Sequence, residues 1–115
     1  MRVLLIDDVR EVEGADFTAR TFDEGMNQLI NKGPWGMLLI DHDLGDFDDT
    51  GRERTGYDIL CFLEQNPQYV PHKIVVVSDN PVGREKMNQV IRNIQKLMRE
   101  MEKTHQELMK EEQNG

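Results

Sequence analysis

Residues 3–8 have the sequence Val-Leu-Leu-Ile-Asp-Asp, and residues 37–43 have the sequence Met-Leu-Leu-Ile-Asp-His-Asp. Each stretch is a short aliphatic run that ends in acidic side chains. Apolar runs of this length are typical of strands buried in a parallel sheet, and ligands of such sheets bind beyond the carboxyl ends of the strands. The two runs therefore predict strands that present Asp7, Asp8 and Asp41 at one edge of an α/β sheet.

Three carboxylates at one edge of a sheet predict a metal site. Like charges held that closely are unfavourable unless a cation neutralises them or their pKa values rise. Hard divalent cations prefer oxygen ligands. We therefore expect Asp7, Asp8 and Asp41 to bind Mg²⁺ or Mn²⁺. The alternative is that these aspartates only cap or solvate a loop.

The composition indicates one domain whose acidity is confined to residues 1–83. The chain has 115 residues, a hydrophobic content of 37% and a formal net charge of −8. Residues 1–83 contain 7 Lys and Arg against 16 Asp and Glu, whereas residues 84–115 contain 7 against 6. This charge argues against binding of bulk nucleic acid or of anionic membranes, although a small phosphorylated ligand could be held through a metal.

Cysteine content and apolar runs bear on cellular location. Cys61 is the single cysteine, so no internal disulfide is expected, and the apolar pattern around it predicts a buried helix residue. Met1 and Arg2 lead directly into an apolar strand, and no apolar run approaches the length of a membrane span. We expect a cytoplasmic protein without a signal peptide or a membrane segment.

Periodicity and turn residues predict four strands, two short helices and one long helix. The strands are expected at residues 2–8, 17–22, 37–40 and 73–77, and the helices at about 23–32, 56–65 and 82–111. Residues 43–55 are polar and contain two glycines, so they predict a long loop.

The segment between the first two strands decides the topology. Residues 9–16 are too few for the usual crossover helix. A hairpin there would make the second strand antiparallel and would place Asp41 at the opposite edge from Asp7 and Asp8. In extended form these residues span roughly 25 Å, which is longer than the strand. We therefore expect an irregular connection and an all-parallel sheet.

The last third of the chain has the pattern of a coiled-coil helix. Seam positions recur at alternating steps of four and three residues, at Met87, Ile91, Ile94, Met98, Met101, His105 and Leu108. A helix over residues 82–111 would be roughly 45 Å long, far longer than the sheet requires.

This pattern predicts a domain over residues 1–83 and a helix over residues 84–115. We expect the first half of the helix to pack on the sheet and the second half to project or self-associate. The simplest partner is a second copy, in a homodimer through residues 87–108. The alternative is a frayed tail.

The opening Met-Arg-Val-Leu-Leu-Ile-Asp-Asp, the later Leu-Leu-Ile-Asp and a strand that ends in a serine resemble the response-regulator receiver fold. The resemblance implies that Asp7 and Asp8 hold Mg²⁺, that Asp41 is the phosphoryl acceptor and that Ser78 carries the switch hydroxyl. An ordinary receiver has a fifth strand that ends in a lysine, and no strand is expected after Val77.

A closer resemblance covers residues 1 to about 90. It is to the cyclic-phosphate-processing receiver-like family, whose members have an aspartate pair, an Asp-His-Asp-Leu-Gly element and a Ser-x-Asn-Pro-x-Gly element. Residues 41–45 and 78–83 match the two elements. The resemblance implies a small flavodoxin-like parallel sheet of about four strands in the order 2-1-3-4, and a role in processing cyclic phosphates. The family has a histidine just before the serine, where this chain has Val77.

The candidate catalytic residues are Asp41, His42 and Asp43. Asp41 would bind the metal or act as a nucleophile. His42 is a candidate general acid or base, because an unperturbed imidazole titrates close to neutrality. Strand alternation directs His42 away from its two neighbours unless the loop turns at this residue, so a structural histidine is the alternative.

The candidate phosphate-binding residues are Ser78, Asn80, Gly83 and Arg84. The N–H groups in the first turn of a helix bind anions, and Pro81 suits that turn. Arg84 would add a positive charge one turn inside the helix. The alternative is that Ser78, Asn80 and Pro81 form only a helix cap.

The sequence leaves three functions open. The first is a metal-dependent phosphoesterase or phosphotransfer enzyme that acts on a cyclic phosphate or another small phosphoester. The second is a catalytically degenerate regulatory or interaction module that dimerises through its last helix, which Val77 and the missing lysine favour. The third is a haloacid-dehalogenase-type phosphatase, because Asp41, Asp43 and Ser78 imitate its first motifs; it is the least favoured, because so short a chain has no obvious place for the remaining motifs.

Overall fold

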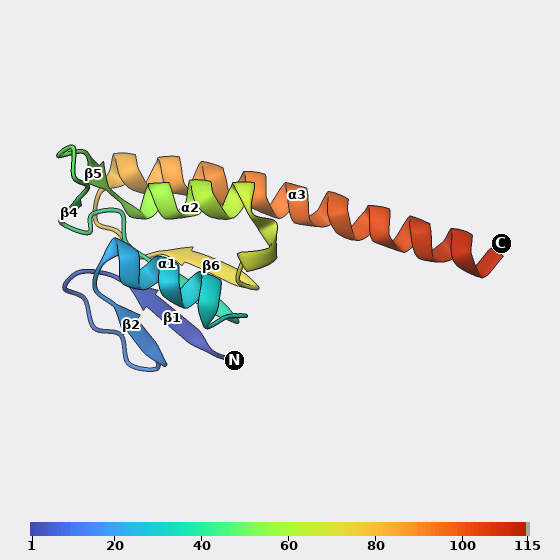
Figure 1. Ribbon diagram of the computed structural model, residues 1–115, viewed down its shortest axis with the longest axis horizontal. Coiled ribbons are helices and arrows are strands. Elements are labelled where there is room, and N and C mark those ends of the chain that lie inside the picture. Colours follow the sequence, from blue (N-terminus) through green and yellow to red (C-terminus); the bar gives the residue numbers. More distant parts are fainter. Residues whose placement is uncertain (115) are drawn as a thin grey trace.

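The computed structural model describes residues 1–114; Gly115, which the sequence placed at the end of the long helix, lies outside the described residues. Four strands form one sheet: β1 (Val3–Ile6), β2 (Phe17–Ala19), β3 (Met37–Ile40) and β6 (Lys73–Val76). The strand order is β2-β1-β3-β6 and every pair is parallel (Figure 1). The predicted order 2-1-3-4 is therefore confirmed.

The connection between β1 and β2 is irregular and is tied to the start of β1. The Asp16 N–H donates to the Val3 carbonyl at 2.8 Å, and the Val3 N–H donates to the Asp16 carboxylate at 2.7 Å. These two bonds return the chain to the beginning of β1 before β2 starts. The second strand can therefore run parallel to the first without a crossover helix.

Three α-helices and one 3₁₀ helix connect or follow the strands: α1 (Phe22–Asn31), α2 (Gly56–Gln65), η1 (Pro67–Tyr69) and α3 (Pro81–Asn114). Thr21 caps α1, and Thr55 with Asp58 forms a capping box on α2. The strand expected at residues 17–22 ends at Ala19, because Thr21 already serves as the cap of the following helix.

The loop expected between β3 and α2 contains a short antiparallel hairpin of β4 (Asp46–Phe47) and β5 (Glu53–Arg54). The Arg54 guanidinium donates to Asp46 at 2.8 Å and to the two carboxylate oxygens of Asp23 at 3.0 and 3.2 Å. The hairpin is therefore attached to the first turn of α1.

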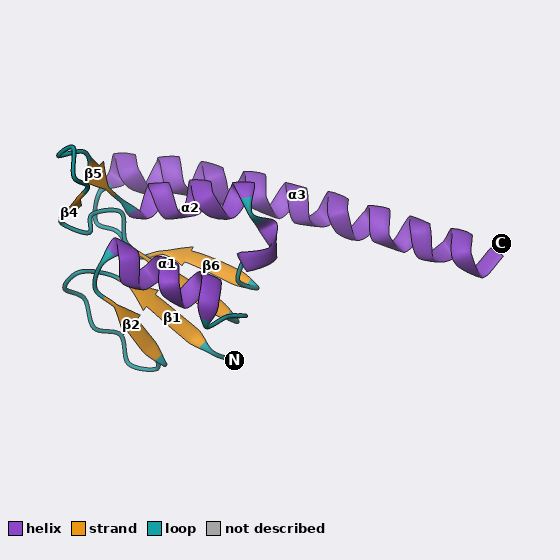
Figure 2. Ribbon diagram, in the orientation of Figure 1, coloured by secondary structure: helices purple, strands orange, loops and turns teal. Residues whose placement is uncertain are grey.

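All three α-helices cover the same face of the sheet (Figure 2). The helices and the strands share one buried core. The strands contribute Leu4, Ile6, Leu38 and Ile40, and the helices contribute Leu29, Leu60, Leu63, Met87, Ile91 and Ile94. Side chains alternate along a strand, so Leu5 and Leu39 point to the opposite face. Asp7 and Asp41 continue the same alternation beyond the ends of β1 and β3.

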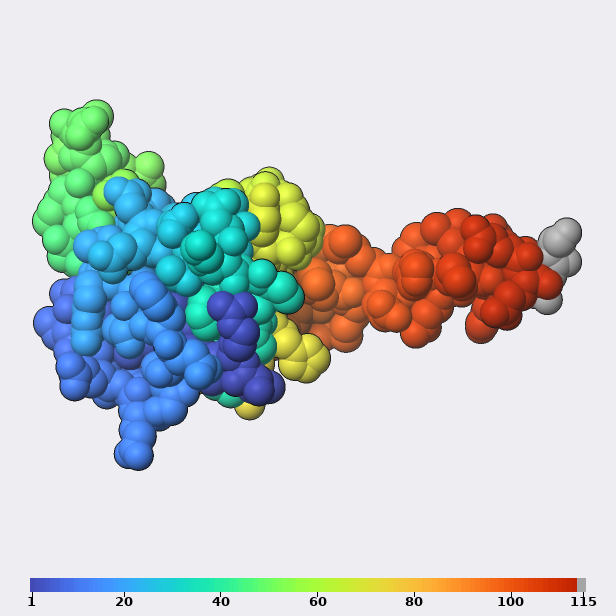
Figure 3. Space-filling model, turned by 60° about the horizontal axis from the view of Figure 1, so that its bottom comes forward, coloured from blue at the N-terminus to red at the C-terminus, as the bar shows by residue number. Residues whose placement is uncertain are grey.

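The long helix α3 packs on the rest of the molecule over its first half. Met87, Val90, Ile91 and Ile94 are buried, whereas every side chain over residues 98–113 is exposed. The second half projects as a stalk (Figure 3) and gives the molecule a long axis of 55 Å against 27 Å for the other two. Within residues 1–114, no helix has both the length and the apolarity that crossing a membrane requires.

Candidate metal centre

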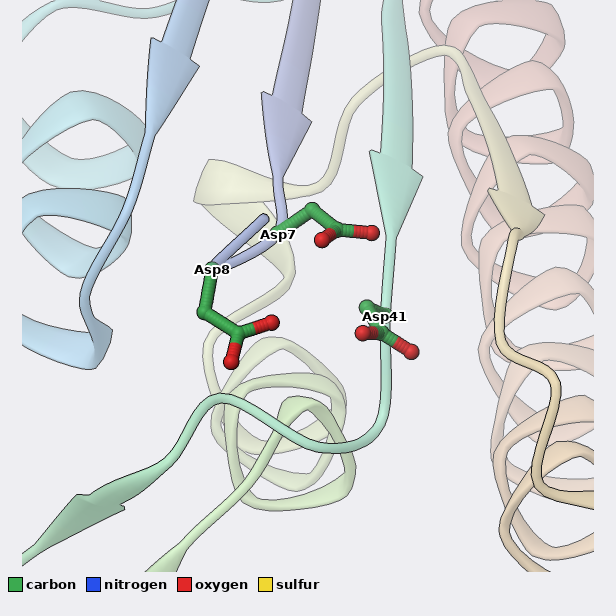
Figure 4. A group of neighbouring side chains, drawn as sticks. All are labelled: Asp7, Asp8 and Asp41. Carbon is green, nitrogen blue, oxygen red and sulfur yellow. The ribbon is translucent and has the colours of Figure 1, made fainter. Parts of the chain in front are cut away.

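The sheet brings Asp7, Asp8 and Asp41 together. Ile6 of β1 pairs with Ile40 of β3, so the residues that follow them lie side by side. The Asp41 N–H donates to the Ile6 carbonyl at 2.9 Å, which keeps the two backbones in register beyond the strands. Each aspartate offers a carboxylate oxygen, and these oxygens all lie within 4.8 Å of one another (Figure 4). This spacing suits three ligands of one cation.

Asp7 is the most deeply buried member of the cluster. Its residue exposure is 1%. One carboxylate oxygen, Oδ1, accepts the N–H groups of Val9 at 3.0 Å and Arg10 at 2.8 Å. The other, Oδ2, accepts no hydrogen bond from the described residues and lies 3.4 Å from Nε of Arg10. A buried carboxylate oxygen without a hydrogen bond is costly, and a cation bound to Oδ2 would offset this cost in competition with Arg10.

Asp41 has a raised pKa in this cluster. Burial is the largest cause, and the negative charge of Asp7 raises the pKa further. Hydrogen bonds from the Ser78 hydroxyl and from the His42 N–H, the latter at 2.8 Å, oppose this shift. The ionised cluster is therefore electrostatically unfavourable by itself, and a divalent cation would remove the repulsion.

Close packing beside Asp41 requires a glycine at the start of α2. A Cβ atom on Gly56 would overlap the Asp41 carbonyl oxygen. The Gly56 N–H donates to the His42 carbonyl at 2.9 Å. The helix thus approaches the end of β3 closely enough to hold the backbone of the candidate ligand in place.

His42 lies outside the carboxylate cluster and contacts the start of α3. A Cβ atom on Gly83 would lie only 2.6 Å from Cγ of the imidazole, so the ring packs directly on that glycine. Nδ1 of His42 is 2.9 Å from the Asp43 carboxylate, which favours a hydrogen on Nδ1. His42 and Asp43 therefore form a pair with each other on the helix side of the sheet edge.

Among the four predicted phosphate-binding residues, Ser78 lies next to the carboxylates. It is 3% exposed, its hydroxyl is near enough to lower the pKa of Asp41, and it accepts the Asn80 N–H at 3.1 Å. The Asn80 side chain accepts the Gly83 N–H at 3.0 Å, and the Asn80 carbonyl accepts the Arg84 N–H at 2.8 Å. Two donors of the first turn of α3 are thus already satisfied by Asn80, and the Arg84 side chain is exposed.

Arg10 is a candidate site residue that sequence reasoning missed. Its Nε lies 3.4 Å from Asp7 Oδ2, and its Nη2 lies 3.2 Å from Asp79 Oδ2. The guanidinium therefore reaches from the carboxylate cluster to the segment after β6. The Arg20 side chain supports this arrangement, because it donates to the carbonyls of Asp7 and Arg10 at 3.2 and 2.6 Å. The one signal of this role in the sequence was a basic residue three positions after Asp7.

A comparison with family models agrees with the receiver-like fold. Residues 2–93 match the model of the cyclic-phosphate processing receiver domain. The match includes all four strands of the sheet, the three aspartates and the segment that begins at Ser78. Neither the comparison with curated proteins nor the comparison with solved structures found a match. The chain therefore belongs, over residues 2–93, to the family of cyclic-phosphate processing receiver domains.

Proposed function

We propose that this domain binds Mg²⁺ or Mn²⁺ through Asp7, Asp8 and Asp41 and that it processes or binds a cyclic phosphate or another small phosphoester there. The observation that carries the proposal is the buried Oδ2 of Asp7, which has no hydrogen bond from the described residues and belongs to a cluster of three close carboxylates. Three oxygen ligands fit a hard divalent cation. Membership of a family named for cyclic-phosphate processing supports the choice of ligand.

The chain's own residues suit the charge of a phosphoester. A bound divalent cation would supply Lewis-acid polarisation of a phosphoryl oxygen. Arg10 lies between Asp7 and Asp79, where its guanidinium can exchange one carboxylate for a phosphate oxygen. In this proposal Arg10 provides the positive charge that a lysine provides in an ordinary receiver, and the Ser78 hydroxyl provides a neutral donor.

The catalytic roles of Asp41, His42 and Asp43 remain predictions. Asp41 belongs to the cluster, where it would act as a ligand or a nucleophile. The His42 and Asp43 pair has the composition of a general base and its orienting carboxylate, with Nδ1 directed to Asp43. The imidazole would have to turn from its contact with Gly83 to act on a phosphoester at the cluster.

A regulatory or interaction module without turnover is the second candidate. Two observations favour it: Val77 stands where the family resemblance leads us to expect a histidine, and Asn80 already satisfies donors at the start of α3. In this case the metal site would bind a phosphoester without cleaving it. Of the predicted dimer segment 87–108, Met87, Ile91 and Ile94 are buried in the chain's own core, so dimerisation through the exposed residues 98–108 would carry the output. The acidity of residues 1–83 argues for a small ligand over bulk nucleic acid in either case.

Hydrolysis of a 2′,3′-cyclic nucleotide in the presence of Mg²⁺ tests the enzymatic proposal. We expect turnover by the wild-type chain, loss of turnover in Asp41→Asn, and normal turnover in Asp49→Asn, which changes an exposed aspartate outside the cluster. Metal-dependent binding of the nucleotide without turnover would leave the regulatory candidate. Absence of both binding and turnover would contradict the proposed ligand class.

The variant Arg10→Gln tests whether Arg10 recognises phosphate. We expect Arg10→Gln to weaken binding of inorganic phosphate to the Mg²⁺-loaded protein by at least about tenfold, since a charge-assisted pair contributes roughly 1.5–3 kcal/mol. Mg²⁺ binding itself should be retained, because Arg10 competes with the cation for Asp7. Calorimetry of both ligands distinguishes these effects; unchanged phosphate affinity in the variant would remove Arg10 from the site.

A further inference from the structure

The exposed half of α3 has an apolar stripe that its own chain leaves uncovered. Met98, Met101, Leu108 and Met109 are 38%, 47%, 56% and 44% exposed. The first three of these residues continue the seam that Met87, Ile91 and Ile94 begin in the buried half of the helix. A single helix in water receives little stabilisation from propensity alone, so a stripe of this kind calls for a partner.

An apolar groove of about 680 Å³ lies where α3 leaves the sheet. Its lining comes from the segments before β3 and β6, from β6 itself and from α3: Pro34, Trp35, Val70, Pro71, His72, Ile74, Ile91, Ile94, Gln95, Met98 and Arg99. Met98 belongs to both the groove and the exposed stripe. The two surfaces are therefore continuous.

The groove and the tip of α3 have opposite charge. Residues 1–83 are strongly acidic, yet the one formally charged side chain among the described residues that line the groove is Arg99. Arg2 adds a second cation next to a groove residue, because its guanidinium lies 4.0 Å from the centre of the Trp35 ring. At the tip of the helix, residues 107–112 contain three glutamates and one lysine. An acidic, apolar helix end thus complements a cationic, apolar groove.

We propose that the groove is occupied by the tip of α3 from a second copy of this chain, in an antiparallel helix pair. Matching the seams places Met98 opposite Leu108 of the partner subunit and Met101 opposite His105 of the partner subunit. The same register brings the acidic tip of each helix to the groove and to Arg99 of the other copy. Each helix then buries its stripe, and each groove is filled.

A parallel pair would be less favourable on the same surfaces. In a parallel pair each seam residue would face the same residue of the partner subunit. The two histidines at position 105 would therefore face each other, and so would the two glutamates at position 112. Like charges in that position repel. It would also hold both acidic tips at one end, about 25 Å from the grooves at 1.5 Å per residue.

Molar mass in solution tests the association. We expect the wild-type chain to move from the mass of one chain to twice that mass as concentration rises in sedimentation equilibrium. Leu108→Glu should abolish the dimer, and this position is exposed in the single chain, so the variant keeps the fold. Lys103→Glu introduces the same residue on the opposite face of the same helix and should leave the dimer intact. A monomeric wild type, or a Leu108→Glu variant that dimerises normally, would overturn the proposal.

Trp35 is the single tryptophan of the chain and lines the groove, so its fluorescence tests the orientation. A nitroxide on Glu111→Cys, in a Cys61→Ser background, should strongly quench the fluorescence of Trp35 of the other copy in the dimer. The fluorescence should recover when dilution dissociates the dimer. A nitroxide on Glu53→Cys, in the distant hairpin, serves as the control and should not quench. A dimer without quenching from position 111 would refute the antiparallel pair. The Mg²⁺ site takes no part in this test.

Discussion

Asp41 is held where its ionised form is disfavoured in the absence of a cation. Burial and the charge of Asp7 raise its pKa, and the hydrogen bonds from Ser78 and His42 do not cancel this effect. If the cluster binds the proposed cation, this carboxylate lowers the stability of the metal-free fold in return for metal affinity, a common relation between stability and function. The same side chain should therefore affect stability in opposite ways with and without Mg²⁺.

Asp41→Asn should raise the thermal unfolding midpoint of the metal-free protein. The stability that a raised pKa confers is present in acid and is lost as the pH rises through that pKa, so at neutral pH the ionised Asp41 is destabilising. Asparagine removes the charge and retains an oxygen that can accept the His42 N–H. Added Mg²⁺ should raise the midpoint of the wild type more than that of the variant at the same Mg²⁺ concentration. A less stable metal-free variant, followed by circular dichroism, would argue against electrostatic repulsion in the cluster.

Position 83 should require a glycine, because the His42 ring leaves no space for a side chain there. Alanine is the better helix former by about 1 kcal/mol, yet a Cβ atom at this position would lie 2.6 Å from the imidazole. We expect Gly83→Ala to lower the free energy of unfolding by about 1–3 kcal/mol, the usual cost of overpacking. Urea denaturation measures the change, with Val82→Ala as the exposed neighbour for comparison.

The double variant Gly83→Ala with His42→Ala provides the control for that contact. Removing the ring should recover most of the loss, because the added methyl group then has space. If the double variant is as unstable as the sum of the two single variants, the imidazole is not what excludes a side chain at position 83.

At the scale of elements, the hairpin β4–β5 depends on a few ionic contacts. Arg54 binds Asp46 and Asp23, and Asp46 also accepts the Phe22 N–H at 2.9 Å. The hydrogen bond from Arg54 is the largest cause of the lowered pKa of Asp46. A lowered pKa confers stability that is present above the unfolded value and is lost as the pH falls through the folded value.

Hydrogen exchange of the hairpin should therefore respond to acid and to Arg54. We expect Arg54→Ala at neutral pH to increase amide exchange in residues 46–54 and at Phe22, while the central strands remain protected. In the wild type, lowering the pH through the folded pKa of Asp46 should have the same effect, after correction for intrinsic exchange rates. Arg52→Ala, which removes a more exposed ion pair with Asp58, is the matched control. Equal protection in both variants would show that Arg54 does not hold the hairpin.

The elements differed in how far the sequence could predict them. The aliphatic runs at residues 3–6 and 37–40 predicted β1 and β3, because unbroken apolar runs report burial on a parallel sheet. The hairpin was missed because its strands are two residues each and are held by Arg54 across the chain, which leaves no periodic signal. The position of Arg10 was missed for a related reason, since only the folded connection directs its side chain to Asp7.

In the candidate site too, the sequence pattern predicted some features, whereas others depended on the tertiary structure. The acidic ends of two adjacent strands predicted that Asp7, Asp8 and Asp41 would lie together, and the structure brings them together. The direction of His42 depended on how the loop leaves β3. In the structure His42 lies outside the cluster that contains Asp41, but it pairs with Asp43 and packs on Gly83, so the alternation ends at Asp43.

At the scale of the whole molecule, one topological feature produces the site. The irregular connection after β1 allows β1, β2, β3 and β6 to run in the same direction. All strands consequently end at one edge, where the three carboxylates, Ser78 and Arg10 lie. The long helix α3 leaves the molecule away from this edge, as Figure 1 shows, so the carboxylate cluster and the proposed dimer surface are separate.

Calorimetric titration of Mg²⁺ into the wild type, Asp41→Asn and Asp49→Asn tests the carboxylate cluster most directly. We predict one site per chain in the wild type and in Asp49→Asn. In Asp41→Asn the affinity should fall by more than about tenfold, the least that is expected when even an outer partner of a metal ligand is removed. Equal Mg²⁺ affinity in wild type and Asp41→Asn, or no Mg²⁺ binding by the wild type, would contradict the assignment of Asp7, Asp8 and Asp41 as the metal centre.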